Sequence, residues 1–277
     1  TIYNVSFSNE VTIALLMMSK HFAGMDPIEW EVFERNVDHD LAQNVANKDE
    51  AHRLAATYSG LPFLAMLFRR HELAQRMLKL YRKVSVIAKG YGTESATMLA
   101  QGLTSAALFR TTGRAKHKNS LKQQIGLARE LVTKKGSNTT SLLQLLKAER
   151  LSLKPITSNS TIVGRTEQAY GIAIAMAEKA SLIHYCAIAC EQLAEYLLRA
   201  KKILARNKGG PNIQPMQTAL HESICKYMAQ AAQLYEDWGC TIKVEDIRNR
   251  RSKYLQADAD NGEIQLRLTG GGGGGGG

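Results

Sequence analysis

The sequence predicts an all-α fold, built as a superhelical array of antiparallel helix pairs. Apolar residues recur at steps of three and four along most of the 277 residues, which is the spacing of one helix face. Glycine weakens helices, and it is scarce outside the run at residues 270–277. Roughly ten such segments follow one another through short turns, and each has an apolar stripe that only a neighbouring helix can bury.

The individual elements follow from caps, stops and periodicity. Gly24, Gly90 and Gly113 stand where apolar patterns end, and Asp26 followed by Pro27 is a helix start. The expected elements are an extended start at 1–8, helices at 10–23, 26–33, 37–47 and 49–58, one or two helices from Pro62 to 89, helices at 93–112, 114–135 and 139–153, a loop at 155–164, helical sequence from 165 with or without a turn near Ser181, a loop at 208–215, helices at 216–238 and 241–254, and an isolated strand at 263–268.

The clearest helical pattern lies between Met216 and Trp238. Its apolar residues step by 4, 4, 3, 4, 3 and 4, which only an α-helix keeps on one face. Gly239 permits the left-handed turn that ends a helix, and Thr241 is expected to cap a short final one. Tyr235 and Trp238 lie three residues apart, so we expect their rings to close the apolar end of the array.

The chain divides into four segments. Residues 1–60 are expected to form acidic N-terminal helices, and residues 61–254 the helical repeat domain. Residues 255–269 either start a following domain or form a tail. The glycine run at 270–277 is a flexible linker or stands for residues of unknown identity. We therefore interpret the chain as part of a longer protein.

Charge is unevenly distributed. The net charge is +11, made up of −5 in residues 1–64, +14 in residues 65–154 and +2 in the remainder. The basic middle third predicts an interaction face for nucleic acid, for an acidic partner or subunit, or for the acidic first third of the chain. Nucleic acid is the least favoured, because only Phe109 is near enough to stack on bases. The residues of this face are Lys116, Lys118, Lys122, Arg129, Lys134 and Lys135.

The sequence lacks the motifs of the common catalytic classes. It contains no phosphate loop, no GxGxxG after a strand, no HExxH, no GxSxG and no kinase signature. We therefore assign no catalytic residue, cofactor or metal. We find no CxxC pair among the cysteines, no secretory signal and no apolar stretch of roughly 18 residues. Reduced thiols, no membrane span and a cytoplasmic setting are expected.

One group of residues resembles part of a metal site. Cys186 and Cys190 have the i, i+4 spacing that can face one zinc ion. His184, however, lies about 200° round a helix from Cys186, and no fourth ligand is nearby. We therefore expect small buried cysteines that pack beside alanines.

Two acidic groups have similar alternatives. The sequence Asp38-His39-Asp40 could bind a metal or act as a base, but a solvated face explains it more simply. Glu191 and Glu195 have the spacing found in di-iron bundles, yet the Glu-x-x-His partners of such sites are missing. We expect these two glutamates to have a surface or inter-helix role.

The second half of the chain resembles a known family. The strings SLLQLLKAER, EQAYGIAIAMAEKASLIHYCAIACEQLAEYLL and ALHESICKYMAQAAQLYEDWGCTIKVEDI resemble the tetratricopeptide-like helical region of very large signalling proteins. In those proteins a P-loop ATPase module of the STAND type precedes the helices, and a sensor histidine kinase or nucleotide cyclase belongs to the same chain. The resemblance covers residues 58–250 and is strongest over 139–247.

The resemblance implies a degenerate tetratricopeptide-like α-solenoid that works by protein–protein contact and has no catalytic residue of its own. It would relay the state of the ATPase module to the kinase or cyclase. Neither module is in this sequence, and the middle third is more basic than the family pattern. The alternative is therefore a structural subunit of a large assembly, with nucleic-acid binding a distant third.

Overall fold

The computed structural model describes seven stretches of the chain, and these are entirely helical apart from their turns. The described residues are 20–25, 29–42, 48–85, 94–135, 139–157, 161–206 and 213–255. Within them, a single helical turn at 20–22 is followed by the helices α2 (Trp30–Ala42), α3 (Lys48–Leu67), α4 (His71–Val84), α5 (Glu94–Thr112), α6 (Ala115–Lys135), α7 (Thr140–Ser152), α8 (Thr161–Lys179), α9 (Ile183–Arg206), α10 (Ile213–Asp237) and α11 (Thr241–Leu255). The all-α class is therefore confirmed.

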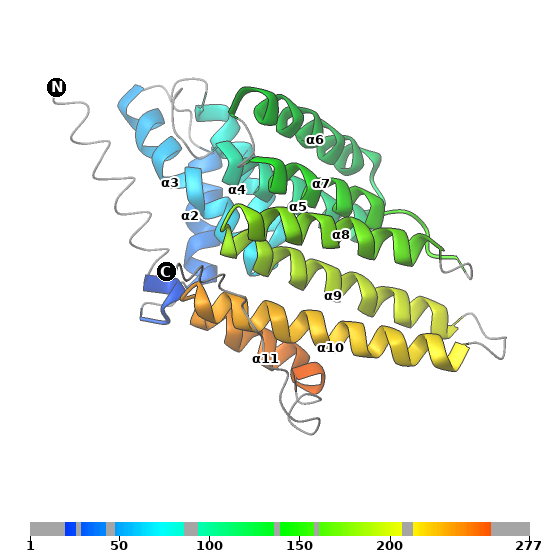
Figure 1. Cartoon of the computed structure of the whole chain (residues 1–277). Helices are drawn as coiled ribbons and strands as arrows, with labels where there is room; N and C mark the ends of the chain where they lie inside the picture. The colour runs from blue at the N-terminus through cyan, green and yellow to red at the C-terminus, as the bar shows by residue number, and fades with distance from the viewer. Residues whose placement is uncertain are drawn as a thin grey trace, which may run out of the picture.

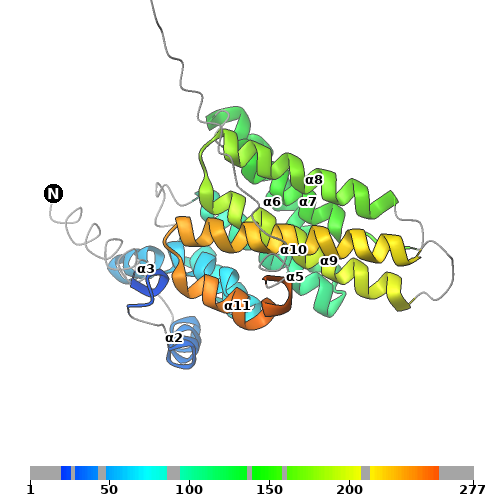
Figure 2. The ribbon, with the colours of Figure 1, turned by 60° about the horizontal axis from the view of Figure 1, so that its bottom comes forward.

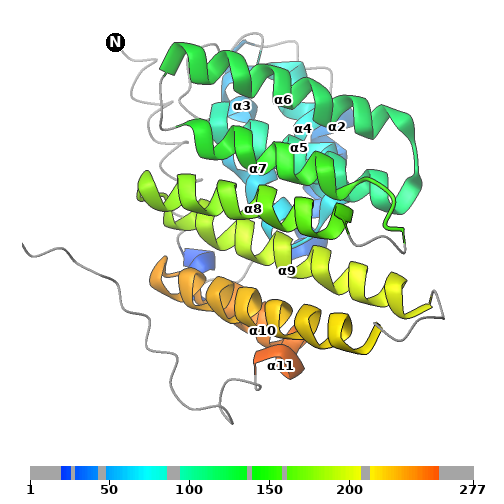
Figure 3. The same ribbon diagram turned by 45° about the vertical axis from the view of Figure 1, so that its right-hand side comes forward.

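The helices lie in a layered stack. From α6 to α10, successive helices run beneath one another across the molecule, and α5 lies behind α7 (Figure 1, Figure 3). From α3 to α11, each helix packs against the next one in the chain, most extensively α9 against α10. Smaller contacts join helices two apart, as in α3 with α5, α5 with α7 and α7 with α9. Figure 2 shows α11 beneath α10, on the side where α2 and α3 lie.

Several predicted boundaries agree with the structure. The helices expected at 93–112 and 114–135 match α5 and α6 within one residue. A turn does separate α8 from α9, and Ser181 occupies it with a positive φ of 54°. Gly239 has φ of 80° and lies in the turn after α10, separated from Asp237 by Trp238, as a predicted helix stop requires.

Other boundaries were wrong. A single helix, α2, replaces the two short helices expected at 26–33 and 37–47. α3 continues through Gly60 and Pro62, because the residues around the proline are buried and packing outweighs its poor helix propensity. α8 and α10 begin at Thr161 and Ile213, inside the expected loops. Thr241 is the first residue of α11 rather than its cap.

The actual break between α3 and α4 falls at residues 68–70. Arg69 has a left-handed φ of 63°, and its amide donates to Met66 O at 3.0 Å. The Arg70 amide donates to Ala65 O at 2.8 Å, so the two bonds satisfy carbonyls at the end of α3. Glycine is usual at such a left-handed position, and the arginine there is explained by the contact of its side chain, described below.

A continuous hydrophobic core runs through all the described helices. Val37 and Leu54, which precede residue 60, belong to the same buried cluster as Leu146 and Ile224. α5 and α7 approach closely at Gly102, where an added Cβ atom would overlap Leu146 Cδ2. The extended start, residues 10–19 of the helix expected at 10–23, the strand at 263–268 and the glycine run lie outside the described residues.

Candidate functional site

Glu191 and Glu195 lie one turn apart on α9, and both are buried. Lys243, at the start of α11, is completely buried beside them. Its Nζ donates to Leu67 O at 2.7 Å, to Glu191 Oε1 at 2.9 Å and to Asp246 Oδ2 at 3.0 Å. These three acceptors use all three ammonium protons, which is what makes burial of a lysine tolerable.

Glu195 accepts hydrogen bonds from three arginines, which come from two segments that are far apart in the sequence. Arg69 Nη1 donates to its Oε1 at 2.8 Å, and Arg251 binds both oxygens, each at 2.9 Å. Arg250 Nη1 reaches Glu195 at 3.2 Å, while its Nη2 lies 3.0 Å from Glu191 Oε1. Burial alone would raise the pKa of Glu195, but the bond from Arg251 and the three positive charges hold it at about 2.

Together these contacts form one carboxylate network, which joins α9 and α11 to the turn between α3 and α4. Tyr235 of α10 completes it, because its buried hydroxyl donates to Glu191 Oε2 at 2.9 Å. The members of the carboxylate network are Arg69, Glu191, Glu195, Tyr235, Lys243, Asp246, Arg250 and Arg251.

A second cluster lies around Glu149 of α7, which is completely buried. Arg110 of α5 donates to Glu149 Oε2 and, at 2.6 Å, to Ser152 Oγ. Tyr170 of α8 donates to the other Glu149 oxygen at 2.6 Å. Arg199 of α9 lies near, and burial together with the charge of Arg110 lowers its pKa to about 10. Hydrogen bonds of the Glu149 cluster therefore join α5, α7 and α8, and Arg199 of α9 lies within their electrostatic influence.

His71, the first residue of α4, lies between the two charged groups. Burial, and then the positive charges of Arg69 and Arg110, lower its pKa to about 4. The charges of Glu149 and Lys243 also influence this pKa, so the carboxylate network and the Glu149 cluster both affect the same imidazole. Its Nδ1 is buried and has no hydrogen-bond partner among the residues that the structure describes. His71 is therefore neutral near pH 7, with one nitrogen unused.

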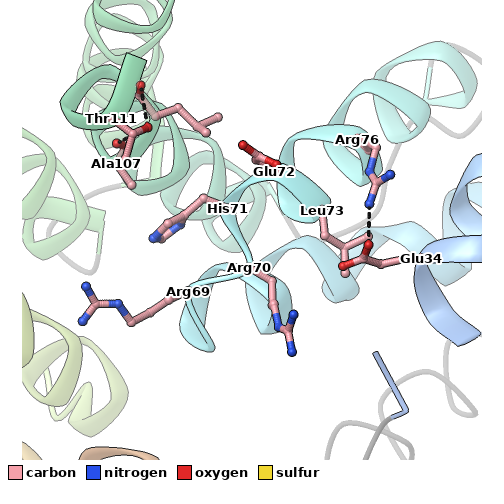
Figure 4. Close-up of a pocket in the computed structure, with 10 residues that line it drawn as sticks. Glu34, Arg69, Arg70, His71, Glu72, Leu73, Arg76, Ala107 and Thr111 are labelled. Carbon is pink, nitrogen blue, oxygen red and sulfur yellow. Dashed lines mark hydrogen bonds and ion pairs between the residues drawn. The ribbon is translucent and has the colours of Figure 1, made fainter. Parts of the chain in front are cut away.

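His71 also lines a pocket of about 350 Å³ at the α3–α4 turn, called the turn pocket below. In Figure 4, Arg69 and His71 extend from one side of the turn and Arg70 from the other, while Arg76 is paired with Glu34. Its walls contain three arginines and two glutamates, with Glu34 from α2 and three residues from the end of α5. The residues that line the turn pocket are Glu34, Arg69, Arg70, His71, Glu72, Leu73, Arg76, Ala107, Leu108 and Thr111.

These groups are suited to recognition and to structural locking. With a pKa of about 2, Glu195 is a very weak base at neutral pH, and its oxygens are occupied by guanidinium groups. The neighbouring cations Lys243 and Arg250 each donate hydrogen bonds to three residues. In the turn pocket, Arg69 and Arg76 are likewise paired with carboxylates, while Arg70 and Glu72 are exposed.

The residues predicted to close the array belong to a cluster of rings. The centroids of Tyr235 and Trp238 lie 6.3 Å apart, and Trp238 also packs on Phe22 at 5.0 Å and on His184 at 5.5 Å. Tyr235 is completely buried and Trp238 is half-buried. Beyond packing, Tyr235 has the polar contact with Glu191 that the sequence did not suggest. A role in closing an array stays a prediction.

The predicted basic face lies on α6, and its side chains divide into two groups. Lys116, Lys118, Lys122, Arg129 and Lys134 are all exposed, whereas the side chain of Lys135 lies outside the described residues. At 100° per residue, Lys118, Lys122 and Arg129 fall within about 40° of one another. Lys116 and Lys134 project together from the opposite flank of α6. The predicted basic face therefore consists of two narrower stripes.

The residues considered for metals and acid–base chemistry have other surroundings. Cys186 and Cys190 are buried free thiols, and burial raises the pKa of Cys186 to about 11. Asp38 is exposed and pairs with Arg76 at 3.0 Å. In the described part of the chain, no group of three or more His, Cys, Asp or Glu residues is arranged to hold a metal ion. Nor is any described helix long and apolar enough to cross a bilayer.

No family model matches the chain, and comparison with curated proteins and with solved structures gave no match either. The family resemblance of the sequence therefore stays a prediction, and function has to be argued from the site itself.

Sequence reasoning found some of the charged residues and missed others. Glu191 and Glu195 were singled out by their spacing, and their inter-helix role is what the structure contains. Asp246 and Arg250 had the same i, i+4 spacing, which would have indicated an ion pair on one helix face. Arg69 lies 126 residues from Glu195, and no local pattern could have connected them.

Proposed function

We propose that this chain is a non-catalytic helical-repeat region that works by protein–protein contact, as a scaffold and relay within a large multidomain signalling protein. Its helices would form a degenerate tetratricopeptide-like solenoid. The packing of successive helices, and of helices two apart, supports this arrangement.

The contacts between Arg69 and Glu195 and between Lys243 and Leu67 are the observation that supports a relay most directly. They join residues 126 and 176 positions apart, so the early α3–α4 turn and the late helix α11 are held as one unit. A displacement at the turn must then strain α11, and the reverse holds too. Mechanical coupling of this kind is what transmission between an upstream and a downstream module requires.

A structural subunit of a large assembly is the second candidate, and the α6 cations favour it. Lys118, Lys122 and Arg129 are exposed on one flank of α6, where they are available to an acidic surface of another subunit. The two candidates differ in whether that surface belongs to the same polypeptide.

Cross-linking of the native polypeptide that contains this sequence tests both. A lysine-reactive cross-linker and mass spectrometry would identify the partners of Lys118 and Lys122, with exposed Lys179 of α8 and Lys253 of α11 as reference positions. The relay predicts α6 cross-links to sequence before Thr1 or after Leu268 of the same chain, and peptides of a P-loop module upstream. Cross-links to a second polypeptide favour the structural subunit. Cross-links confined to these 277 residues would overturn both.

A further inference from the structure

Within the described helices, Arg199 of α9 is a cation that pairs with no carboxylate. Its Nη2 is buried and has no hydrogen-bond partner among the residues that the structure describes, and its guanidinium carbon lies 5.9 Å from the Tyr196 ring centroid. Burial, and then the charge of Arg110, lower its pKa to about 10. The guanidinium is therefore still protonated near pH 7, and its charge lies where water screens it poorly.

The two carboxylates whose charges act on Arg199 are already occupied by other donors. Glu149 accepts from Arg110 at one oxygen and from Tyr170 at the other. Glu195 accepts from three arginines of the carboxylate network. Counted with Arg199, the Glu149 cluster thus contains two cations and one carboxylate.

The carboxylate network also has one more cation than it has carboxylates, but its surroundings differ. The side chains of its three arginines are between 26% and 39% exposed. Water can screen the surplus charge there, as it does for ion pairs at the surface. The uncompensated charge that matters most is therefore the one in the Glu149 cluster.

A second buried donor lies in the same cluster. The Nε of Arg110 is buried and lacks a partner in the described part of the chain. Arg110 is close enough to Arg199 for its charge to lower the pKa of Arg199, so the two guanidinium groups repel each other. Buried N–H groups are normally satisfied, and a water molecule would satisfy them without removing the repulsion. A small anion would do both.

We propose that the Glu149 cluster binds one chloride ion, with Arg199 Nη2 and Arg110 Nε as its donors. A single negative charge balances the two arginines against Glu149 and the ion, whereas a divalent anion would reverse the excess. Chloride is compact and accepts hydrogen bonds from any direction, which suits two guanidinium groups held by other contacts. Arg199 is only partly buried, so an ion can reach it from solvent. The inference is independent of the partner that α6 contacts.

The dependence of stability on chloride tests the site. The 277-residue chain is unfolded with urea in sodium methanesulfonate, and chloride then replaces this larger monovalent anion at constant ionic strength. At a chloride concentration about ten times the dissociation constant, binding should lower the equilibrium constant for unfolding about tenfold. The effect should saturate, and bromide should reproduce it.

Two arginine variants locate the ion. Arg199→Met removes the unpaired cation, and Arg165→Met removes an exposed arginine from α8 as the control. Without its main donor, the Arg199→Met protein should show no saturable response to chloride. The ratio of its unfolding constant to that of the wild type should therefore change about tenfold over the titration. The same ratio for Arg165→Met should change by less than about twofold.

Each contrary result has a distinct meaning. A wild-type protein whose stability does not respond to chloride would overturn the proposal and leave water as the partner of Arg199. An equal loss of the chloride response in both variants would place the ion on the protein surface, which overturns the site as well. If Arg199→Met does not fold, the line width of the chloride NMR signal decides. Folded wild-type protein should broaden it and added bromide should reverse the broadening, whereas an unchanged line overturns the site.

Discussion

Lys243 Nζ lies 2.7 Å from the backbone carbonyl oxygen of Leu67, a contact between residues 176 positions apart. The lysine side chain is completely buried, and so it contacts the end of α3 from inside the molecule. This single bond places the start of α11 against the α3–α4 turn. Most of the following predictions test what it and its neighbours contribute.

Replacing Lys243 by Met should strongly destabilise the protein. The change removes the completely buried cation beside Glu191, which keeps its contact with Arg250, and it leaves Leu67 O without the Lys243 donor. Breaking a buried pair in this way costs about 3–5 kcal/mol. Urea denaturation would measure the free energy of unfolding. Lys179→Met on the exposed side of α8 is the control and should change it by less than about 0.5 kcal/mol. If Lys243→Met lowers the free energy of unfolding no more than the control does, the buried contacts of Lys243 do not stabilise the fold. Combining Lys243→Met with Glu191→Gln should cost less than the sum of the two.

Arg69 combines an unfavourable backbone conformation with a useful side chain, and two variants separate these effects. Arg69→Ala loses the contact with Glu195 and keeps a Cβ at φ of 63°. Arg69→Gly loses the same contact but relieves the left-handed strain, which is about 1 kcal/mol. We therefore expect the glycine variant to be the more stable of the two by about that amount in thermal denaturation. If the two variants unfold together, the left-handed backbone is not strained.

Acid should weaken the carboxylate network in a defined window. The pKa of Glu195 is about 2 in the folded protein and 4.5 without its partners, so the folded state favours the ionised form. Its contribution is complete above about pH 4.5 and is lost as the pH falls towards 2, by up to about 3 kcal/mol. Asp246, with a pKa also lowered to about 2, acts in the same direction. Urea midpoints between pH 6 and pH 2.5 check this, and Asp246→Asn should flatten the decline where exposed Glu236→Gln does not.

Acid should also lower stability through His71, in a pH window above that of Glu195. Its pKa is about 4 when folded and 6.5 when unfolded, so below pH 6.5 the unfolded chain takes up the proton first. Stability therefore falls between pH 6.5 and pH 4, by on the order of 2 kcal/mol for a half-buried imidazole. His71→Gln removes the titration. The difference in unfolding free energy between the two proteins should shrink as the pH drops from 6.5 to 5, and a constant difference would refute the assignment.

Two glycines offer a matched test of helix packing. A methyl group on Gly102 of α5 would overlap Leu146 of α7, whereas Gly126 of α6 has nothing within 4 Å of the same position. Gly102→Ala should destabilise by about 1–3 kcal/mol because the buried Leu146 side chain must shift or α5 and α7 must separate. Gly126→Ala should stabilise by about 0.5–1 kcal/mol through helix propensity. Thermal denaturation of both distinguishes close packing from a general effect of glycine.

The helices were predictable from the sequence wherever periodicity and stops agreed, as in α5 and α6. They were not predictable where burial overrides a local rule, and Pro62 inside α3 is the clearest case. The site was predictable only in part. Glu191 and Glu195 stood out by spacing, but their cations come from other helices, and pairing across 50 to more than 120 residues leaves no local pattern. The turn pocket depends on a break at Arg69, which the sequence placed elsewhere.

The direction of chain synthesis gives the carboxylate network a further consequence. Glu191 receives bonds from Tyr235, Lys243 and Arg250, all of which follow it in the sequence. A ribosome therefore makes this glutamate more than 40 residues before any of its partners. Until α11 has been made, α9 has an acidic group that it cannot favourably bury. The nascent helices can pair locally, but their final arrangement must await the last one.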